Sequence, residues 1–133
     1  MKISFILYGA PRTKKNHGRV RWSRKQRRRM HVPSEAWERW RDSIVFWRDP
    51  VMFHRSDLRS HLDPIKEPVN CAAIFYRDAL RGDAVGYYQG LADVLEYYRI
   101  VEDDRFIVSW DGSRLEKDAK NPRVEVTLES EEK

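Results

Sequence analysis

The sequence predicts an α+β fold, a two-layer sandwich in which helices cover one face of a mixed β-sheet. Two observations predict the layers. Residues 2–8 alternate apolar side chains and residues 69–77 form an apolar run, as strands do. Two other segments repeat apolar residues every three or four positions, as amphipathic helices do. The order strand, basic segment, helix, irregular segment, strand, helix, strand, strand is typical of a sheet interrupted by helices.

Length and composition favour one small domain spanning residues 1–133. The chain has 133 residues, of which 41% are hydrophobic and 35% charged, so it can bury one modest core. Its net charge of +5 favours an anionic partner, most often nucleic acid. A single cysteine excludes a disulfide within the chain and fits a reducing compartment. No apolar window is long enough for a signal peptide or a membrane span, so we expect a soluble, cytoplasmic protein without a membrane partner.

The first strand is predicted at residues 2–8, where Ile3, Phe5 and Leu7 share one face. Gly9-Ala10-Pro11 ends it. Residues 12–30, called the basic arm below, are dense in Lys and Arg and nearly free of apolar residues. No core can form there, so we expect a loop or a long exposed hairpin.

A helix is predicted to begin after Ser34, a favourable N-cap, and to end before Asp49-Pro50. Its apolar stripe is formed by Trp37, Trp40, Ile44 and Trp47. The interpretation favoured for these tryptophans is core packing rather than stacking on bases. The following segment, 51–68, has no clear period.

The second half begins with a strand at 69–77, apolar on both faces and therefore expected in the centre of the sheet. Within it we expect Cys71 to be a buried, inert thiol. A helix follows at about 84–98, with a buried stripe formed by Tyr87, Leu91, Val94, Leu95 and Tyr98. Strands are predicted at 105–110 and 123–128, with a hairpin turn at Asp111-Gly112 after the first of them. The acidic tail, 129–133, is expected to fray.

The basic arm is the strongest charge feature. Lys and Arg at this density neutralise phosphates and release counterions, and Trp22 could stack on an unpaired base. The alternative interpretations of the basic arm are a solvated run of charges or a contact with an acidic protein. We prefer nucleic acid because no acidic residue dilutes the segment. The predicted DNA-binding residues are Arg12, Lys14, Lys15, Asn16, Arg19, Arg21, Trp22, Arg24, Lys25, Arg27, Arg28 and Arg29.

Three acidic residues flank the second helix: Asp83 directly precedes it, and Asp103 and Asp104 follow it. Converging carboxylates suit Mg²⁺, or alternatively Mn²⁺. A straight helix of about 15 residues would separate Asp83 from Asp104 at about 1.5 Å per residue. They meet only if the loop 98–104 returns along the helix or a second subunit supplies one of them. The bland alternatives are that Asp83 is a helix N-cap and that the pair is a solvated turn.

Several blocks in this order resemble the RusA family of Holliday junction resolvases, especially its phage-associated members. Gly9-Ala10-Pro11-Arg12-Thr13-Lys14-Lys15-Asn16 looks like the family's G-x-P-x-x-K-x-N segment. Pro33-Ser34 with Trp37 and Trp40 is similar to its first helix. Gly82-Asp83, Asp93-Val94-Leu95 and Glu102-Asp103-Asp104 match the spacing of its D-x-D-N-x-x-K…D-x-L…D-D signature. Asp111-Gly112-Ser113-Arg114 and 121–126 look like its closing strands.

The resemblance implies a RusA-like homodimer that binds divalent metal and cuts four-way DNA junctions in recombination and repair, with no organic cofactor. Asp83 then takes the first signature aspartate, Asp104 the last, and Asp103 the acidic residue before it. The chain departs from the signature in having Val85 at the second aspartate, Gly86 at the asparagine and Gln89 at the catalytic lysine. Two hypotheses for compensation are that Asp93, one turn beyond Gln89, joins the site, or that Asp103 turns inward.

Three functions therefore stand as hypotheses. The first is a metal-dependent endodeoxyribonuclease that resolves branched DNA. The second is a DNA-binding module on the same fold whose chemistry has decayed, favoured by Val85 and Gln89. The third is a binder of single-stranded or structured RNA, supported only by the basic arm and Trp22.

Overall fold

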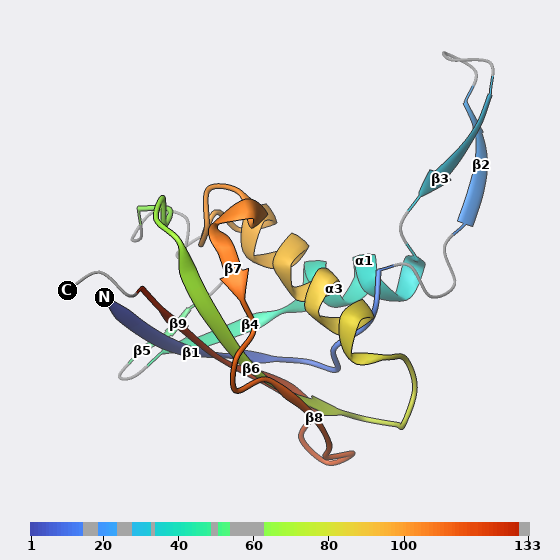
Figure 1. Cartoon of the computed structure of the whole chain (residues 1–133). Helices are drawn as coiled ribbons and strands as arrows, with labels where there is room; N and C mark the ends of the chain where they lie inside the picture. Colours follow the sequence, from blue (N-terminus) through green and yellow to red (C-terminus); the bar gives the residue numbers. More distant parts are fainter. Residues whose placement is uncertain (15–18, 24–27, 33, 49–50, 54–62, 131–133) are drawn as a thin grey trace.

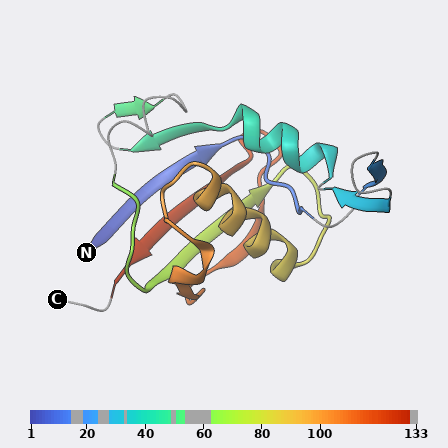
Figure 2. The same cartoon turned by 90° about the horizontal axis from the view of Figure 1, so that it is seen from above.

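The computed structural model of the chain describes residues 1–14, 19–23, 28–32, 34–48, 51–53 and 63–130. Within these residues, two α-helices lie on one face of an open, mixed β-sheet (Figure 1). The view from above shows α3 (Ala84–Tyr97) lying over the strands and α1 (Glu35–Ser43) running into β4 (Val45–Arg48) along the edge of the sheet (Figure 2). The predicted α+β class and the one-sided helix layer are therefore confirmed.

The sheet has seven strands in the order β5-β4-β1-β9-β6-β7, and β8 also pairs with β6. The bounds are β1 (Lys2–Tyr8), β4 (Val45–Arg48), β5 (Val51–Phe53), β6 (Val69–Arg77), β7 (Ile107–Ser109), β8 (Arg114–Lys117) and β9 (Arg123–Glu129). The pairs β1–β4, β1–β9, β4–β5 and β6–β9 are antiparallel, whereas β7 and β8 run parallel to β6. The two ends of this order stay unpaired with each other, so the sheet does not close into a barrel.

The three long central strands lie where the sequence places them. β1 and β6 have the predicted bounds, and β9 extends one residue further. Burial alternates along the whole of β6, with Cys71 and Phe75 fully buried. β6 is central, as predicted, but only the face beneath the helices is fully buried, because no helix among the described residues covers the other side.

Both helices begin at the predicted caps. α1 (Glu35–Ser43) starts after Ser34, whose side chain accepts a hydrogen bond from the Trp37 backbone N–H. α3 (Ala84–Tyr97) starts after Asp83 in the same way. The core includes the whole predicted stripe of α3, namely Tyr87, Leu91, Val94, Leu95 and Tyr98. Trp37 and Trp40 are 3% and 4% exposed, which confirms their role in core packing.

The prediction that the first helix continues to Trp47 is wrong. The helix ends at Ser43, and residues 45–48 form β4, which pairs with β1. The physical reason is that Ile44, Val45 and Phe46 are β-branched or aromatic, so they favour a strand wherever a sheet edge is available. β1 offers that edge, and β5 extends it into a segment for which the sequence predicts no element.

The hairpin predicted at Asp111-Gly112 is also wrong, although the turn itself is present. β7 and β8 do not pair with each other but follow one another along the same edge of β6. The interruption between them is bridged by Asn70, whose Oδ1 accepts from the Ser109 hydroxyl at 2.6 Å and from the Asp111 backbone N–H at 2.8 Å. The predicted strand 105–110 is correspondingly shorter, since its first residues form the 3₁₀ helix η1 (Asp104–Phe106).

Part of the basic arm is a hairpin, one of the two predicted forms. β2 (Arg19–Ser23) and β3 (Arg28–Val32) pair antiparallel as a separate sheet that projects from the body beside α1 (Figure 1). The predicted DNA-binding residues Lys15, Asn16, Arg24, Lys25 and Arg27 lie outside the described residues.

The predicted fraying begins later than expected. Glu129 belongs to β9, and the Ser130 backbone N–H donates to the Met1 carbonyl at 3.0 Å. Residues 131–133 lie outside the described residues. None of the described helices has the length and apolar character needed to cross a membrane.

Candidate active site

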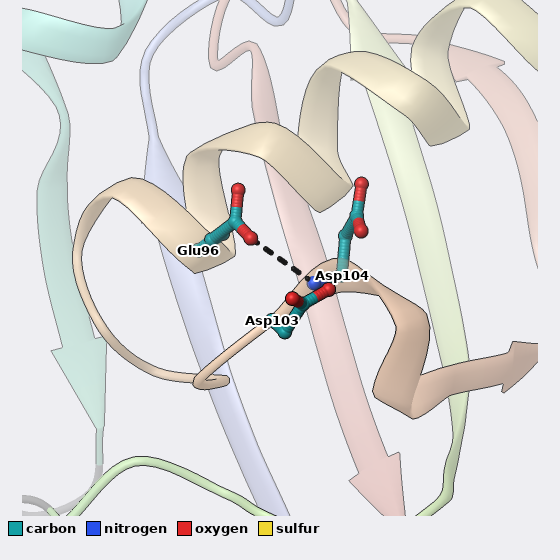
Figure 3. Close-up of side chains that lie close together, drawn as sticks. All are labelled: Glu96, Asp103 and Asp104. Atoms are coloured by element: carbon teal, nitrogen blue, oxygen red, sulfur yellow. Dashed lines mark hydrogen bonds between the residues drawn. The ribbon is translucent and has the colours of Figure 1, made fainter.

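Three carboxylates gather where α3 ends and the chain turns back. Glu96 lies in the last turn of α3, and Asp103 and Asp104 follow in the returning segment (Figure 3). One carboxylate oxygen from each lies within 4.8 Å of the others. These three residues are called the acidic cluster below.

The turn after α3 brings the cluster together. Arg99 adopts a positive φ of 61°, which is uncommon for a residue with a side chain, and so reverses the chain. The Ile100 backbone N–H then donates to the Leu95 carbonyl at 2.9 Å, and the Glu102 N–H donates to the Ile65 carbonyl at 3.0 Å. The returning segment is thereby held against the last turn of the helix.

Backbone hydrogen bonds also orient the carboxylates. Asp103 caps η1, because its Oδ1 accepts from the Arg105 backbone N–H at 3.0 Å. Glu96 Oε1 accepts from the Asp104 backbone N–H at 3.4 Å. Each of these two carboxylates keeps its second oxygen outside the hydrogen bond that positions it.

The two neighbouring aspartates have pKa values displaced in opposite directions. Partial burial, followed by the proximity of Asp103 and Asp93, raises the pKa of Asp104 above its usual range. The hydrogen bond from the Arg105 N–H lowers the pKa of Asp103. Close carboxyls with separated pKa values are typical of acid–base sites and of cation sites.

The donor set fits a hard divalent cation. All three ligand groups are carboxylates, and Mg²⁺ takes one or two protein carboxylates while keeping several waters. The described residues that would hold such an ion are Glu96, Asp103 and Asp104. A bound Mg²⁺ or Mn²⁺ would supply neutralisation of phosphate charge and a bound water of lowered pKa.

Asp83 lies at the other end of α3 from the cluster. Its Oδ1 accepts from the Gly86 backbone N–H at 2.8 Å, as an N-cap does. The returning loop reaches only as far back as Glu96 and the vicinity of Asp93. A single subunit therefore keeps Asp83 apart from Asp104, as the length of the helix predicts. Val85 and Gln89 are both exposed on the turns between the two ends.

Asp93 contacts the basic arm instead of joining the cluster. Its Oδ2 lies 3.1 Å from Lys14 Nζ. This oxygen is buried and accepts no well-aligned hydrogen bond from the described residues, so the charge of Lys14 is what neutralises it. Lys14 Nζ also lies 5.0 Å from the centre of the Trp37 ring, a cation–π distance.

The chain enters and leaves the basic arm at one place, where residues 12–14 lie against Ser34; this place is called the neck below. The Ser34 backbone N–H donates to the Lys14 carbonyl at 3.1 Å, and the Ser34 hydroxyl donates to the Thr13 carbonyl at 3.2 Å. α3 packs directly on this neck, because a Cβ added at Gly90 would lie 2.8 Å from the Arg12 carbonyl oxygen. Glycine is therefore required there for the close approach.

Arg12, predicted to bind DNA, is engaged within the protein. Its guanidinium donates to both oxygens of Asp78, at 2.8 and 3.0 Å. This bidentate pair lowers the pKa of Asp78.

The cluster includes one residue that the sequence prediction missed. Glu96 continues a polar line on α3 that already includes Gln89 and Asp93, at spacings of four and three residues. Extending that line by one turn would have found it. Its approach to Asp103 and Asp104 depends on the turn at Arg99, for which the sequence has no local signal such as glycine.

No protein-family model matches the chain, and no curated protein matches it either.

Proposed function

We propose that this protein is a metal-dependent endodeoxyribonuclease that cuts branched DNA. The observation that carries the proposal is the ion pair between Lys14 and Asp93. It ties the neck of the basic arm to the helical turn that precedes Glu96, and so brings one lysine of the arm to within about one helical turn of the acidic cluster. A phosphodiester nuclease needs both features close together: cations for the DNA backbone and oxygen ligands for a metal.

In this proposal, different residues bind the DNA and hold the metal. The basic arm neutralises backbone phosphates and positions the strand, with Lys14 fixed at its base. Glu96, Asp103 and Asp104 hold the divalent ion, and Asp93 positions Lys14.

The substrate class and the assembly rest on the resemblance to the RusA family. That resemblance supports a homodimer acting on four-way junctions, with Mg²⁺ as the metal and Mn²⁺ as a substitute. A second subunit is also the route by which Asp83 would reach a neighbouring acidic cluster.

Two observations favour the second candidate, a DNA-binding module without nuclease activity. Asp83, the first aspartate of the resemblance, caps α3 and lies apart from the cluster. Val85 is 72% exposed and has no oxygen to offer a metal.

The deciding experiment compares a labelled synthetic four-way junction with a linear duplex of the same sequence. Each is incubated with Mg²⁺, with Mn²⁺ or with a chelator. Nicks on the junction alone that require metal would support the nuclease. Selective binding of the junction with no cleavage in either metal would support the second candidate, the DNA-binding module without nuclease activity.

A further inference from the structure

A second cationic feature lies beside α1, on the neck of the basic arm. It is a cleft of about 670 Å³ between α1 and the segment that follows β1. Its described lining contains three arginines and no carboxylate: Ala10, Arg12, Ala36, Arg39, Trp40, Ser43 and Arg81.

The three arginines give the cleft a net positive charge. Arg12 and Arg81 both contact Asp78, with a distance of 3.0 Å from the Arg81 guanidinium to Asp78 Oδ2. Arg39 is exposed and has no acidic partner among the described residues. Three positive charges against one negative charge leave a net charge of +2.

A buried hydrogen-bond donor also belongs to this cleft. Trp40 is 4% exposed, yet its indole Nε1–H has no acceptor among the described residues. The edge of the indole that carries Nε1 packs against the residue before Ala10, because a Cβ added at Gly9 would lie 3.5 Å from Trp40 Cδ1 and 3.8 Å from Nε1. An orphaned buried donor costs free energy unless an acceptor reaches it. By contrast, the indole N–H of Trp37 donates to the Gly90 carbonyl at 3.2 Å.

We propose that this cleft binds a phosphate group, with Arg39 and Arg81 contacting its oxygens and Trp40 Nε1–H donating to one of them. Arginine suits this role because its planar donors match phosphate oxygens. We further propose that a backbone phosphate of bound DNA is the source, because Arg12 and Lys14 belong to one short neck segment. Only this second statement rests on the proposed function.

The first test follows the indole N–H resonances of ¹⁵N-labelled protein while inorganic phosphate is added. Chloride at equal ionic strength serves as the control, and Trp40→Phe assigns the Trp40 signal. We expect saturable movement of the Trp40 signal with phosphate and none of the Trp37 signal, whose donor is already bonded. Arg39→Gln should weaken the response about tenfold, since it removes a charged donor. Lys66→Gln, which removes a charge at the opposite end of β1, should leave it unchanged. A Trp40 signal that does not move, or that moves equally with chloride or in Arg39→Gln, would overturn the proposal.

The second test measures the affinity for the four-way junction against salt concentration, in chelator, for the parent protein and Arg39→Gln. Loss of one phosphate contact should lower the slope of log affinity against log salt by about 1. If phosphate moves the Trp40 indole resonance but Arg39→Gln leaves this slope unchanged, the ligand is a free phosphate-bearing molecule. The statement that a backbone phosphate of DNA occupies the cleft is then wrong. Failure of cleavage in every metal would count against the nuclease and leave both binding results intact.

Discussion

The ion pair between Lys14 and Asp93 should be a measurable stabilising contact that fixes the basic arm to α3. The perturbations are Asp93→Asn, Lys14→Met and the double variant, each of which keeps most of the side-chain volume. Under the proposed function Asp93 positions Lys14, because its carboxylate lies 3.1 Å from Lys14 Nζ and outside the acidic cluster.

The expected size of the effect follows from distance and burial. At the 3.1 Å that separates Lys14 Nζ from Asp93 Oδ2, the Coulomb attraction is about 1.3 kcal/mol in water and about 5 kcal/mol at an effective dielectric constant of 20. The side chains are 16% exposed for Asp93 and 32% exposed for Lys14, so desolvation offsets much of the larger value. We expect a net coupling of about 1–2 kcal/mol.

Urea unfolding of the four proteins at neutral pH gives the coupling from a double-mutant cycle. The matched control is the exposed pair of Lys66 and Glu102, whose charges lie 3.8 Å apart and whose coupling should be near zero. A Lys14–Asp93 coupling below about 0.3 kcal/mol, equal to that of the control pair, would refute the reasoning.

Three further predictions concern single substitutions and one thiol. Because the pKa of Asp104 is raised in the folded state, its ionisation weakens folding as the pH rises through that pKa. Asp104→Asn should therefore melt higher than the parent at neutral pH without metal, by a few degrees at most, and the difference should vanish near pH 3; a lower melting temperature at neutral pH would contradict this. Gly90→Ala forces a methyl group to 2.8 Å from the Arg12 carbonyl oxygen. It should destabilise the protein by about 1–2 kcal/mol in urea unfolding, despite the better helix propensity of alanine. An unchanged urea midpoint would contradict this and show that the backbone at Arg12 shifts to make room for the methyl group. Burial raises the pKa of the Cys71 thiol, so a thiol reagent at pH 8 should react with it only after unfolding; fast labelling of the native protein would contradict the burial of β6.

Local sequence patterns predict the parts of the fold that carry a full period of their own. β1, β6 and α3 have complete apolar periods, and their bounds agree with the structure to within a residue. β4 does not, because Trp47 continues the helical spacing of Trp37 and Trp40 while pairing with β1 decides its conformation. The same holds for β7 and β8, which are separated by a turn but share one edge of β6. Strands at sheet edges depend on partners far away in the chain, which a local pattern does not contain.

In the acidic cluster, too, local sequence predicts some members, whereas another depends on contacts between distant parts of the chain. Asp103 and Asp104 stand out in the sequence because adjacent acids repel unless solvated or shared with a cation. Their separation from Asp83 follows from the rise of a helix. Glu96 comes close to them only because the chain reverses at Arg99, a conformation that favours glycine and that tertiary hydrogen bonds hold in place.

The measurement that tests the central claim most directly is the metal dependence of junction cleavage in three carboxylate variants: Glu96→Gln, Asp83→Asn and Glu102→Gln. Glu102 directly precedes the cluster in sequence but is not a member of it, so it is the matched control. If Glu96, Asp103 and Asp104 hold the metal, Glu96→Gln should lower the cleavage rate at least 10-fold and require more Mg²⁺, since losing a ligand weakens metal binding. Glu102→Gln should then cut like the parent. Full activity of Glu96→Gln together with an inactive Asp83→Asn would contradict the account, and would move the metal to the opposite end of α3.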